Sequence, residues 1–538
     1  GLMTVGRNSV LSLGTDDTGK AEQAFAESEL TWGKTGVSAA LYVDQAQKLQ
    51  VQGGILLDGT KTAASAEANK ASFADGSLLI VNGSGIGTSG TAALTGGSGS
   101  TLTVNQGAKL YLTSTNAGTY TIAKGFANTT IDGWSWSADA AAVDVSVNKL
   151  SEIEKIEKNT ADGDFTVTVR QTDVQKKYDG IALPNILQAM DQSRTEYAGI
   201  KYLTDLANDN KLDKEGFIAA VNSFAQGAEN SGATRTGALA ALDLGTAVQE
   251  HLSLAKAAAE QSGGFGKAAV DTADNGGIWA QYIHNKDKVD NMGGVSYDGQ
   301  YNGVIIGGDF ADRGKYSSGI AFSYGSGDST GSASKNEFDF WGLSYYGGIQ
   351  NGDTNLIFDV GYSKTSSDVK GVIKAEPDTQ VISMGIKGEK VISNGHGTSY
   401  VPYAGLRYMN IDTDSYNGSI DGKTAAHYST DKADLWLLPV GISISHESVT
   451  AGGWKVRPTA DIAYVWTLGD KNTAMDITVP GVNATDRLGY DIMDSGFFVG
   501  KLGLEAEKGD WTYGLGYACQ KGSHAQNSKF MLNVTYSF

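Results

Sequence analysis

Residues 530–538 read FMLNVTYSF, and apolar side chains alternate with polar ones along this stretch. The apolar members are Phe530, Leu532, Val534, Tyr536 and Phe538, and the polar ones between them are Asn533, Thr535 and Ser537. Successive residues of a β-strand point to opposite faces of the sheet, so this strand has two chemically different faces. It ends a long series of similar segments, a rhythm typical of a transmembrane β-barrel.

Twelve segments with this alternation are predicted in the C-terminal half of the chain. They are residues 277–285, 300–311, 315–325, 337–350, 354–364, 379–391, 398–411, 433–447, 453–467, 497–508, 511–520 and 526–538. Short turns follow the second, fourth, sixth, eighth and tenth segments, whereas longer connectors follow the odd-numbered ones up to the ninth; the longest are 412–432 and 468–496. Outer-membrane barrels have short periplasmic turns and long external loops. We therefore expect a twelve-stranded antiparallel barrel over residues 277–538, with both of its termini periplasmic.

The composition limits the classes of protein to which the chain can belong. Its 538 residues include 71 glycines, six prolines and 19% charged residues, which favours a mainly β structure. No apolar run approaches the roughly 18 residues of a membrane-spanning helix, so the chain could cross a bilayer only as a closed sheet. A formal charge of -18 argues against a nucleic-acid partner. The chain starts without a signal-peptide pattern, and we expect an export signal to have been removed or to lie upstream.

Residues 1–175 are rich in Gly, Ser, Thr, Asn and Ala, broken by short aliphatic bursts such as 41–43, 78–81 and 110–112. These bursts predict strands of four or five residues between Gly or Asn turns. Their spacing favours a parallel β-solenoid whose coils stack aliphatic side chains in a central column. Because the spacing has no strict period, an antiparallel sandwich is the alternative.

Residues 183–262 change to a helical pattern. Pro184 suits a first helical position, and a second helix is expected after Asp213. A third helix is predicted over residues 233–262, and its small residues include Gly237, Ala241 and Gly245. Glycine costs about 1 kcal/mol relative to alanine in a helix interior, so two glycines indicate a slender helix in a confined space. A helix of this length extends roughly 40 Å, enough to thread a membrane pore.

The alternation in the barrel strands assigns charged side chains to one face and apolar ones to the other. The charged residues expected in the lumen are Asp359, Lys387, Arg407, Arg457, Asp461, Lys501 and Glu505. Charges of both signs are costly in a dry core and acceptable around a hydrated lumen that holds a polar helix. On the third helix Arg235, Asp243 and Glu250 are candidate partners, with Arg407, Arg457, Asp461 and Glu505 expected opposite them. The alternative is that the charges solvate an open channel.

The other face of the barrel is expected to contact lipid. In the eighth strand the apolar residues that share this face include Trp436, Ile442 and Ile444, and the single cysteine, Cys519, is placed on the same side of its strand. Aromatic residues near strand ends are candidates for the girdles at the membrane interfaces. These are Tyr282, Tyr301, Tyr400, Trp454, Trp466, Trp511 and Tyr536.

The order of the predicted parts resembles that of the monomeric (type Va) autotransporters of Gram-negative bacteria. These parts are a solenoid-like region, a helical linker, a twelve-stranded barrel and a terminal aromatic residue. The local sequences that carry the resemblance are GIWAQ at 277–281, YNGVIIGGD at 301–309, PYAGLRY at 402–408 and the terminal alternation. The resemblance implies type V secretion: a barrel anchored among outer-membrane lipids and inserted by the barrel-assembly machinery. The terminal strand (Phe530, Leu532, Val534, Tyr536 and Phe538) would be the assembly signal. Residues 1–175 would be the end of a passenger on the cell surface.

Some relatives of that family cut themselves at an Asn-Asn pair in the linker helix, and this helix contains no such pair. Two motifs suggest chemistry, GDSTG at 327–331 and the glycines at 85, 87 and 90, but neither has the strand-to-helix context that its function requires. The six histidines lack metal-ligand spacing. We expect no metal, no cofactor and no enzymatic activity in these residues.

The sequence thus favours an outer-membrane autotransporter that exports and anchors its own N-terminal passenger. An adhesive or self-associating passenger is expected, with host-surface molecules or other copies as partners, because solenoids present long repetitive faces. One alternative is a porin-like channel with an N-terminal cap. Another is an anchor for a surface hydrolase whose catalytic domain lies upstream of residue 1.

Overall fold

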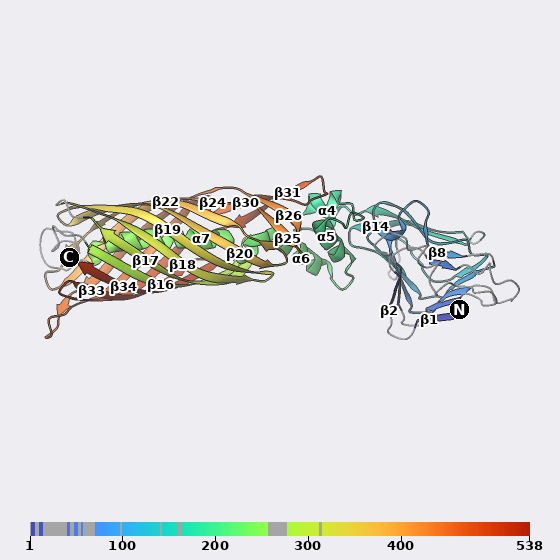
Figure 1. Cartoon of the computed structure of the whole chain (residues 1–538), viewed down its shortest axis with the longest axis horizontal. Coiled ribbons are helices and arrows are strands. Elements are labelled where there is room, and N and C mark those ends of the chain that lie inside the picture. The colour runs from blue at the N-terminus through green and yellow to red at the C-terminus, as the bar shows by residue number, and fades with distance from the viewer. Residues whose placement is uncertain are drawn as a thin grey trace. The chain divides into compact units, whose positions relative to one another are not determined.

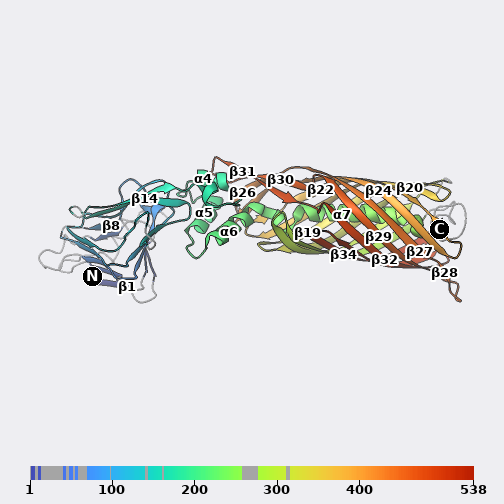
Figure 2. The ribbon, with the colours of Figure 1, turned by 180° about the vertical axis from the view of Figure 1, so that it is seen from behind.

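The chain forms two compact units in a computed structural model (Figures 1 and 2). The first comprises residues 1–222 and 479–485, and the second comprises residues 223–478 and 486–538. The residues that the structure describes are 2–5, 10–13, 40–43, 48–51, 55–57, 70–96, 99–139, 143–159, 161, 163–256, 277–310 and 315–537.

Three sheets form the N-terminal part of the first unit, and most of their strands pair in parallel. The first sheet contains β1 (Leu2–Val5), β3 (Ala40–Val43), β6 (Lys70–Phe73), β9 (Thr101–Val104) and β12 (Asn128–Ile131). The second contains β2 (Val10–Leu13), β4 (Lys48–Val51), β7 (Leu78–Asn82), β10 (Lys109–Thr113) and β13 (Val145–Val147). The third contains β5 (Ile55–Leu57), β8 (Ala92–Gly96) and β11 (Gly118–Lys124), followed by the antiparallel β15 (Asp164–Gln171) and β14 (Ser151–Asn159).

The chain visits the three sheets in turn, so each coil stacks on the one before it. Aliphatic side chains at equivalent positions, such as Leu79 and Leu110, are paired in register and buried in one common core. Near the end of the stack, Trp134 packs between Phe73 and Phe165 at ring distances of 5.1 and 5.2 Å. Parallel stacking of this kind is the pairing expected of a solenoid. The solenoid predicted over residues 1–175 covers segments outside the described residues and stays a prediction.

Helices follow the last coil. They are α3 (Val174–Lys177), α4 (Pro184–Ala189), α5 (Ala198–Asn208), α6 (Lys214–Gln226), η1 (Gly227–Ser231), α7 (Ala233–His251) and η2 (Leu254–Lys256). Pro184 opens α4 as predicted, and the Asp213 carboxylate accepts a hydrogen bond from the backbone of Gly216 at the start of α6. A one-turn helix, α2 (Gly83–Ile86), lies within the glycine-rich stretch singled out above. Among the described helices, none has both the length and the apolar character needed to cross a membrane.

The second unit is a closed antiparallel barrel of twelve long strands within the described residues. They are β16 (Gly277–Met292), β17 (Val295–Asp309), β18 (Tyr316–Gly331), β19 (Ser334–Asn351), β20 (Thr354–Gly371), β22 (Asp378–Lys390), β24 (Thr398–Thr413), β27 (Ala433–His446), β29 (Lys455–Gly469), β32 (Gly496–Lys508), β33 (Trp511–Lys521) and β34 (Ala525–Ser537). The first and last strands pair from Gly277 with Ser537 to Val289 with Ala525, and this pairing closes the barrel.

Many strands are longer than the sequence predicted. The predicted loops 412–432 and 468–496 contain the short strands β25 (Tyr416–Ile420), β26 (Lys423–Thr430), β30 (Asn472–Thr478) and β31 (Thr485–Asp491). They extend the barrel wall at one end, which we call the η1 end because η1 lies there. We call the other end, where Gly277 meets Ser537, the terminal end. The GDSTG motif, expected in a loop, lies within strand β18 and therefore cannot form a strand-to-helix turn.

Alternate residues of the barrel strands face outward, and most of those in the middle of the wall are apolar. Ile442, Ile462 and Leu502 are outward and are 39%, 67% and 66% exposed. Cys519 is also exposed, on the outward side of β33. An outer surface this rich in exposed aliphatic and aromatic side chains is stable when lipid is its solvent.

Candidate functional site

Helix α7 runs inside the barrel and packs against β19, β20 and β22 (Figure 1). Gly237, Ala241 and Gly245 are four residues apart and therefore share one face of the helix. A Cβ atom on Gly237 would lie 2.6 Å from Cγ2 of Thr379, and one on Gly245 would lie 2.2 Å from Nη1 of Arg407. The small residues thus allow the helix to lie directly against the barrel wall.

The helix ends eleven residues before the predicted end at residue 262, because side chains of the wall hold its C-terminal turn. Asn355 donates a hydrogen bond to the carbonyl of Leu252 at 3.0 Å. The Glu389 carboxylate accepts from the backbone nitrogen of Leu254 at 2.6 Å and from the hydroxyl of Ser253 at 2.8 Å. The Ala-rich sequence after residue 254 favours helix, but these capping contacts terminate α7 at His251. A helix of 19 residues spans about 28 Å.

Arg235 fixes the first turn of α7 to the barrel wall. Its Nε and Nη2 atoms lie 2.7 and 2.9 Å from the two carboxylate oxygens of Asp287 on β16, and Nη1 donates to the carbonyl of Ile492 at 2.9 Å. Both side chains of the ion pair are buried. A bidentate contact between arginine and carboxylate has a fixed geometry, so this pair sets the rotation of the helix as well as its depth.

Asp243, two turns further on, is the centre of a second buried cluster. Its carboxylate pairs with Lys529 of the last strand and accepts hydrogen bonds from the hydroxyl of Tyr301 and, at 3.1 Å, from Nδ2 of Asn285. The side chains of Asp243 and Lys529 are 6% and 8% exposed. Removal of one member of such a pair leaves the other charge buried without compensation.

On the opposite wall, Asp359 links the helix to β24. Arg407 donates to both of its carboxylate oxygens, at 2.8 and 2.9 Å, and also to the hydroxyl of Ser383 at 2.7 Å. Gln249 of α7 donates to the same carboxylate at 2.8 Å. The pair Asp359 and Arg407 therefore belongs to the wall, and the helix adds only a neutral hydrogen bond to it.

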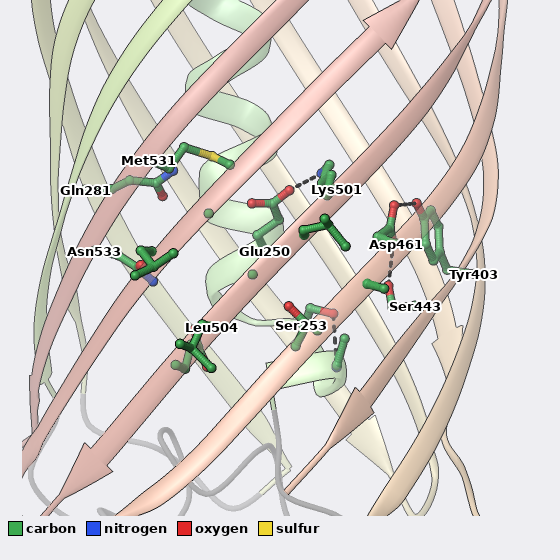
Figure 3. Close-up of a pocket in the computed structure, with 18 of the residues that line it drawn as sticks. Glu250, Ser253, Gln281, Tyr403, Ser443, Asp461, Lys501, Leu504, Met531 and Asn533 are labelled. Atoms are coloured by element: carbon green, nitrogen blue, oxygen red, sulfur yellow. Dashed lines mark hydrogen bonds and ion pairs between the residues drawn. The ribbon is translucent and has the colours of Figure 1, made fainter.

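A cavity of about 120 Å³, lined by both polar and apolar side chains, lies between the end of α7 and the wall formed by β27, β29 and β32–β34 (Figure 3). Glu250 reaches across it to Lys501, and this is the third ion pair between helix and barrel. Asp461 lines the same cavity and accepts hydrogen bonds from the hydroxyls of Tyr403 and Ser443 (Figure 3). The helix thus packs tightly on one wall and faces this cavity on the other.

An aromatic cluster surrounds the end of α7 at the terminal end of the barrel. The imidazole of His251 stacks on Trp279 at a ring distance of 4.7 Å, and its Nε2 atom lies 2.9 Å from the Asp309 carboxylate. Tyr346 donates to Asp309 at 2.7 Å and accepts from the indole nitrogen of Trp279 at 2.8 Å. These contacts close the lumen around the last turn of the helix.

At the η1 end, two stacked tyrosines hold the segment that precedes α7. The hydroxyl of Tyr428 donates to the carbonyl of Phe224 at 2.5 Å, and the hydroxyl of Tyr416 accepts from the backbone nitrogen of Ala228 at 3.0 Å. Glu229 follows directly and is buried, with its carboxylate 2.6 Å from the hydroxyl of Thr234. Burial raises the pKa of Glu229 to about 7, although the hydrogen bonds from Thr234 act in the opposite direction.

We expect the attachment of the segment around Glu229 to the barrel to depend on pH. Its pKa rises from 4.5 to about 7 on folding, so the folded state holds the proton more tightly, and the stabilisation is lost as the pH rises from about 4.5 to 7. We expect the amide protection of residues 228–236, corrected for intrinsic exchange, to fall about a hundredfold over this range. In Glu229→Gln, which stays neutral, protection should stay constant. An equal fall in both proteins would contradict the assignment.

The remaining predicted lumen charges also lie inside the barrel. Arg457 is 1% exposed and forms ion pairs with Glu447 at 3.3 Å, with Glu505 at 3.7 Å and with Glu507. Lys387 lies 3.4 Å from Glu389 and 4.3 Å from the centre of the Tyr403 ring. These contacts lie within the wall and do not involve α7.

The partners expected for the helix were therefore largely wrong. Arg235 pairs with Asp287 and Asp243 with Lys529, whereas Arg407 and Arg457 pair with carboxylates of the wall. The first predicted strand ended at residue 285, so Asp287 fell outside it, although it shares the inward parity of Asn285. Lys529 was detectable in the same way, because it alternates with the apolar residues of the last strand.

Tyr301, predicted to lie in a membrane girdle, is 3% exposed and points into the lumen. Its parity on β17 is that of Ile305, a buried residue, so the prediction from its place near a strand end was wrong. In β34 the predicted assembly residues Phe530, Leu532 and Val534 are exposed on the outward face, and Tyr536 is partly exposed. Phe538 lies outside the described residues.

Chemically, the lumen is a set of paired charges and hydrogen bonds around a helix. The described residues contain no group of three or more side chains suited to hold a metal ion. The ion pairs and hydrogen bonds between α7 and the barrel wall can hold a polypeptide segment in one position. The fold and this site define a membrane-embedded β-barrel, closed by a single chain and plugged by its own helix.

Residues 278–518 match the family model described as the autotransporter beta-domain. Similar solved structures include the translocator domain of autotransporter NalP from Neisseria meningitidis, with 14% identity over 58% of this chain and 100% of that chain and a TM-score of 0.43. The beta domain of the Bordetella autotransporter BrkA is 17% identical over 49% of this chain and 100% of that chain, with a TM-score of 0.40. The transport unit of the autotransporter AIDA-I from Escherichia coli is 15% identical over 49% of this chain and 90% of that chain, with a TM-score of 0.39. No curated protein sequence matches the chain.

Residues 278–518, most of the barrel, thus match the autotransporter beta-domain. This match and the closed barrel at the C-terminal side of the chain support an autotransporter of the monomeric, type Va kind. All twelve long strands come from one chain, as the monomeric kind requires. Its place is the outer membrane, and its secretion route is type V.

Proposed function

We propose that this protein exports and then anchors its own N-terminal region on the cell surface, where that region acts as an adhesive or self-associating module. The main observation in support of this proposal is that α7 occupies the lumen. Ion pairs with Asp287, Lys529 and Lys501 hold it along its length. The chain that leaves the barrel at the η1 end leads back to the stacked sheets. A helix held in this way is suited to retain exported material after translocation.

The same arrangement supports a proposal for the orientation of the barrel in the membrane. Both ends of the barrel sequence, Gly277 and Ser537, meet at the terminal end, where β16 pairs with β34. The short strands β25, β26, β30 and β31, which lie in the two longest connectors, extend the wall at the other end, as expected of the external side of an outer-membrane barrel. We therefore place the terminal end in the periplasm and residues 1–175 outside the cell.

The proposed role of the N-terminal region is binding and not catalysis. Stacked coils present long, regular and exposed faces, which suit repetitive contacts with another surface or with a second copy. A hydrolase anchored through this chain would need a catalytic domain upstream of residue 1. The porin-like alternative has less support, because the ion pairs of α7 obstruct the lumen.

The proposal can be tested on intact cells that express the full chain or a variant lacking residues 1–175. External protease should remove the N-terminal region from intact cells and leave the barrel in the membrane. Cells with the full chain should also settle or adhere faster than cells with the truncated variant, at equal barrel levels. Full protection of the N-terminal region would refute the orientation, and equal settling and adhesion with both proteins would refute the adhesive role.

A further inference from the structure

Three lysines gather on the outer surface where the barrel closes. They lie across β33, β34 and β16, three strands that are neighbours in the sheet. Lys521 is paired in register with Gln526, and Gln526 with Lys288, so these three residues form one row across the strands. In the next row, Ser528 is paired with Lys286. The three lysines are exposed.

These rows lie just beyond the apolar band of the barrel. The adjacent row toward the terminal end contains Tyr517, Phe530 and His284, and the following row contains Leu515, Leu532 and Tyr282. The four apolar or aromatic members on β33 and β34 are 41% to 51% exposed and face lipid. Two residues of a strand advance about 7 Å, so the lysines begin one step beyond the last aromatic row. That level corresponds to the polar headgroups of the membrane.

The lysines of this cluster differ from other outward lysines in their partners. In the part of the chain that the structure describes, Lys286 and Lys288 form no ion pair, and Lys521 donates to the neutral Gln526 at 3.3 Å. Other outward lysines do pair: Lys335 with Glu337, Lys364 with Asp378 and Lys370 with Asp368. Three lysines in two adjacent rows, none of them in an ion pair within the described residues, are notable in a chain of net charge -18.

Two carboxylates lie on the far side of the cluster. Asp298 is next to Lys288 in the row, and Asp328 lies one strand further and accepts from Gln300 at 3.4 Å. Both line the same shallow surface hollow as Lys286, Lys288, Gln526 and Ser528. The two carboxylates confine the positive potential of the lysines to the side of β34 and β33. On that side Gln526 and Ser528 offer additional hydrogen-bond donors.

We propose that the cluster of Lys286, Lys288 and Lys521 binds the phosphate of a lipid headgroup at the closing seam of the barrel. Lysine is a point-charge ligand for phosphate, and cations at the edge of a membrane attract anionic headgroups. The leaflet depends on the proposed orientation, which places the cluster on the external side. The lipid is then the phosphorylated glycolipid of the outer leaflet. Bound there, it contacts the first and the last strand of the barrel together.

The test uses the full chain, purified in a neutral detergent and titrated with phosphorylated lipid A or with the same lipid after removal of its phosphates. The wild type should bind the phosphorylated lipid more tightly. Each lysine should contribute about fivefold, so the triple variant Lys286→Gln, Lys288→Gln and Lys521→Gln should bind about a hundredfold more weakly. The control triple variant Lys335→Gln, Lys364→Gln and Lys370→Gln removes the same charge elsewhere and should change binding less than threefold.

Equal weakening in the two triple variants would show a general charge effect and overturn the site. Equal binding of both forms of the lipid would overturn phosphate recognition. Neither result depends on which way the barrel is inserted, because detergent solution has no leaflets. A wrong orientation would instead appear in the protease experiment on intact cells, so the two failures can be told apart.

Discussion

Replacing Asp243 by alanine is expected to release the plug helix from the barrel. The change leaves the buried ammonium of Lys529 without its carboxylate. Tyr301 loses its acceptor, and Nδ2 of Asn285 keeps its hydrogen bond to the hydroxyl of Tyr301. Breaking a buried ion pair from one side costs about 3–5 kcal/mol, which corresponds to more than a hundredfold shift toward states in which α7 has left its position. In planar bilayers, the variant should show frequent openings of large conductance, whereas the intact chain should stay mostly closed.

A double variant provides the control for this experiment. Asp243→Leu combined with Lys529→Met removes both charges and keeps apolar volume, and such replacements are often neutral or stabilising. The double variant should therefore be closed more often than Asp243→Ala. Large, steady conductance of the unmodified chain would instead support the porin-like alternative and contradict the role given to these pairs.

The second large effect is expected from Gly245→Leu. Even the Cβ atom would lie 2.2 Å from Nη1 of Arg407 and 2.7 Å from its Nη2. Arg407 cannot move aside without losing both hydrogen bonds to Asp359. Overpacking alone typically costs 1–3 kcal/mol, occasionally more. We expect the helix to be displaced from β20 and β22, and α7 to become sensitive to protease in the purified protein.

The neighbouring residue offers a matched control. Thr246 lines the space between α7 and the wall that contains Leu437 and Val465, so a leucine there meets open volume and not the guanidinium group. Thr246→Leu should leave α7 as resistant to protease as in the wild type. Equal sensitivity of the two leucine variants would show that the contact at Gly245 is not what places the helix.

The sequence predicted that the helix would lie in a confined space. Gly237 and Gly245 are poor helix residues whose presence indicated confinement, and the structure places the barrel wall within van der Waals distance of both. The point at which the helix ends was not predictable. It depends on Asn355 and Glu389, which lie about a hundred or more positions further along the chain and cap the last turn only once the barrel has closed.

For the charged residues of the lumen, too, one property was predictable from the sequence and another was not. That Arg457, Asp461 and Lys501 face inward follows from their parity, because neighbouring residues of a strand must point to opposite faces. Which charge meets which depends on the register between strands, the tilt of the barrel and the rotation of α7. The pair of Asp243 and Lys529 joins residues 286 positions apart, and no local pattern encodes that distance.

The sequence by itself determined that twelve two-faced strands would close into a barrel and that a slender helix would precede them, because strand alternation and helix composition are local properties of the chain. Only the tertiary structure decided where the helix lies in the lumen, which wall it touches and which three ion pairs hold it. Those choices depend on how a closed sheet positions side chains from distant strands, since buried charges are stable only where the fold brings their partners within reach.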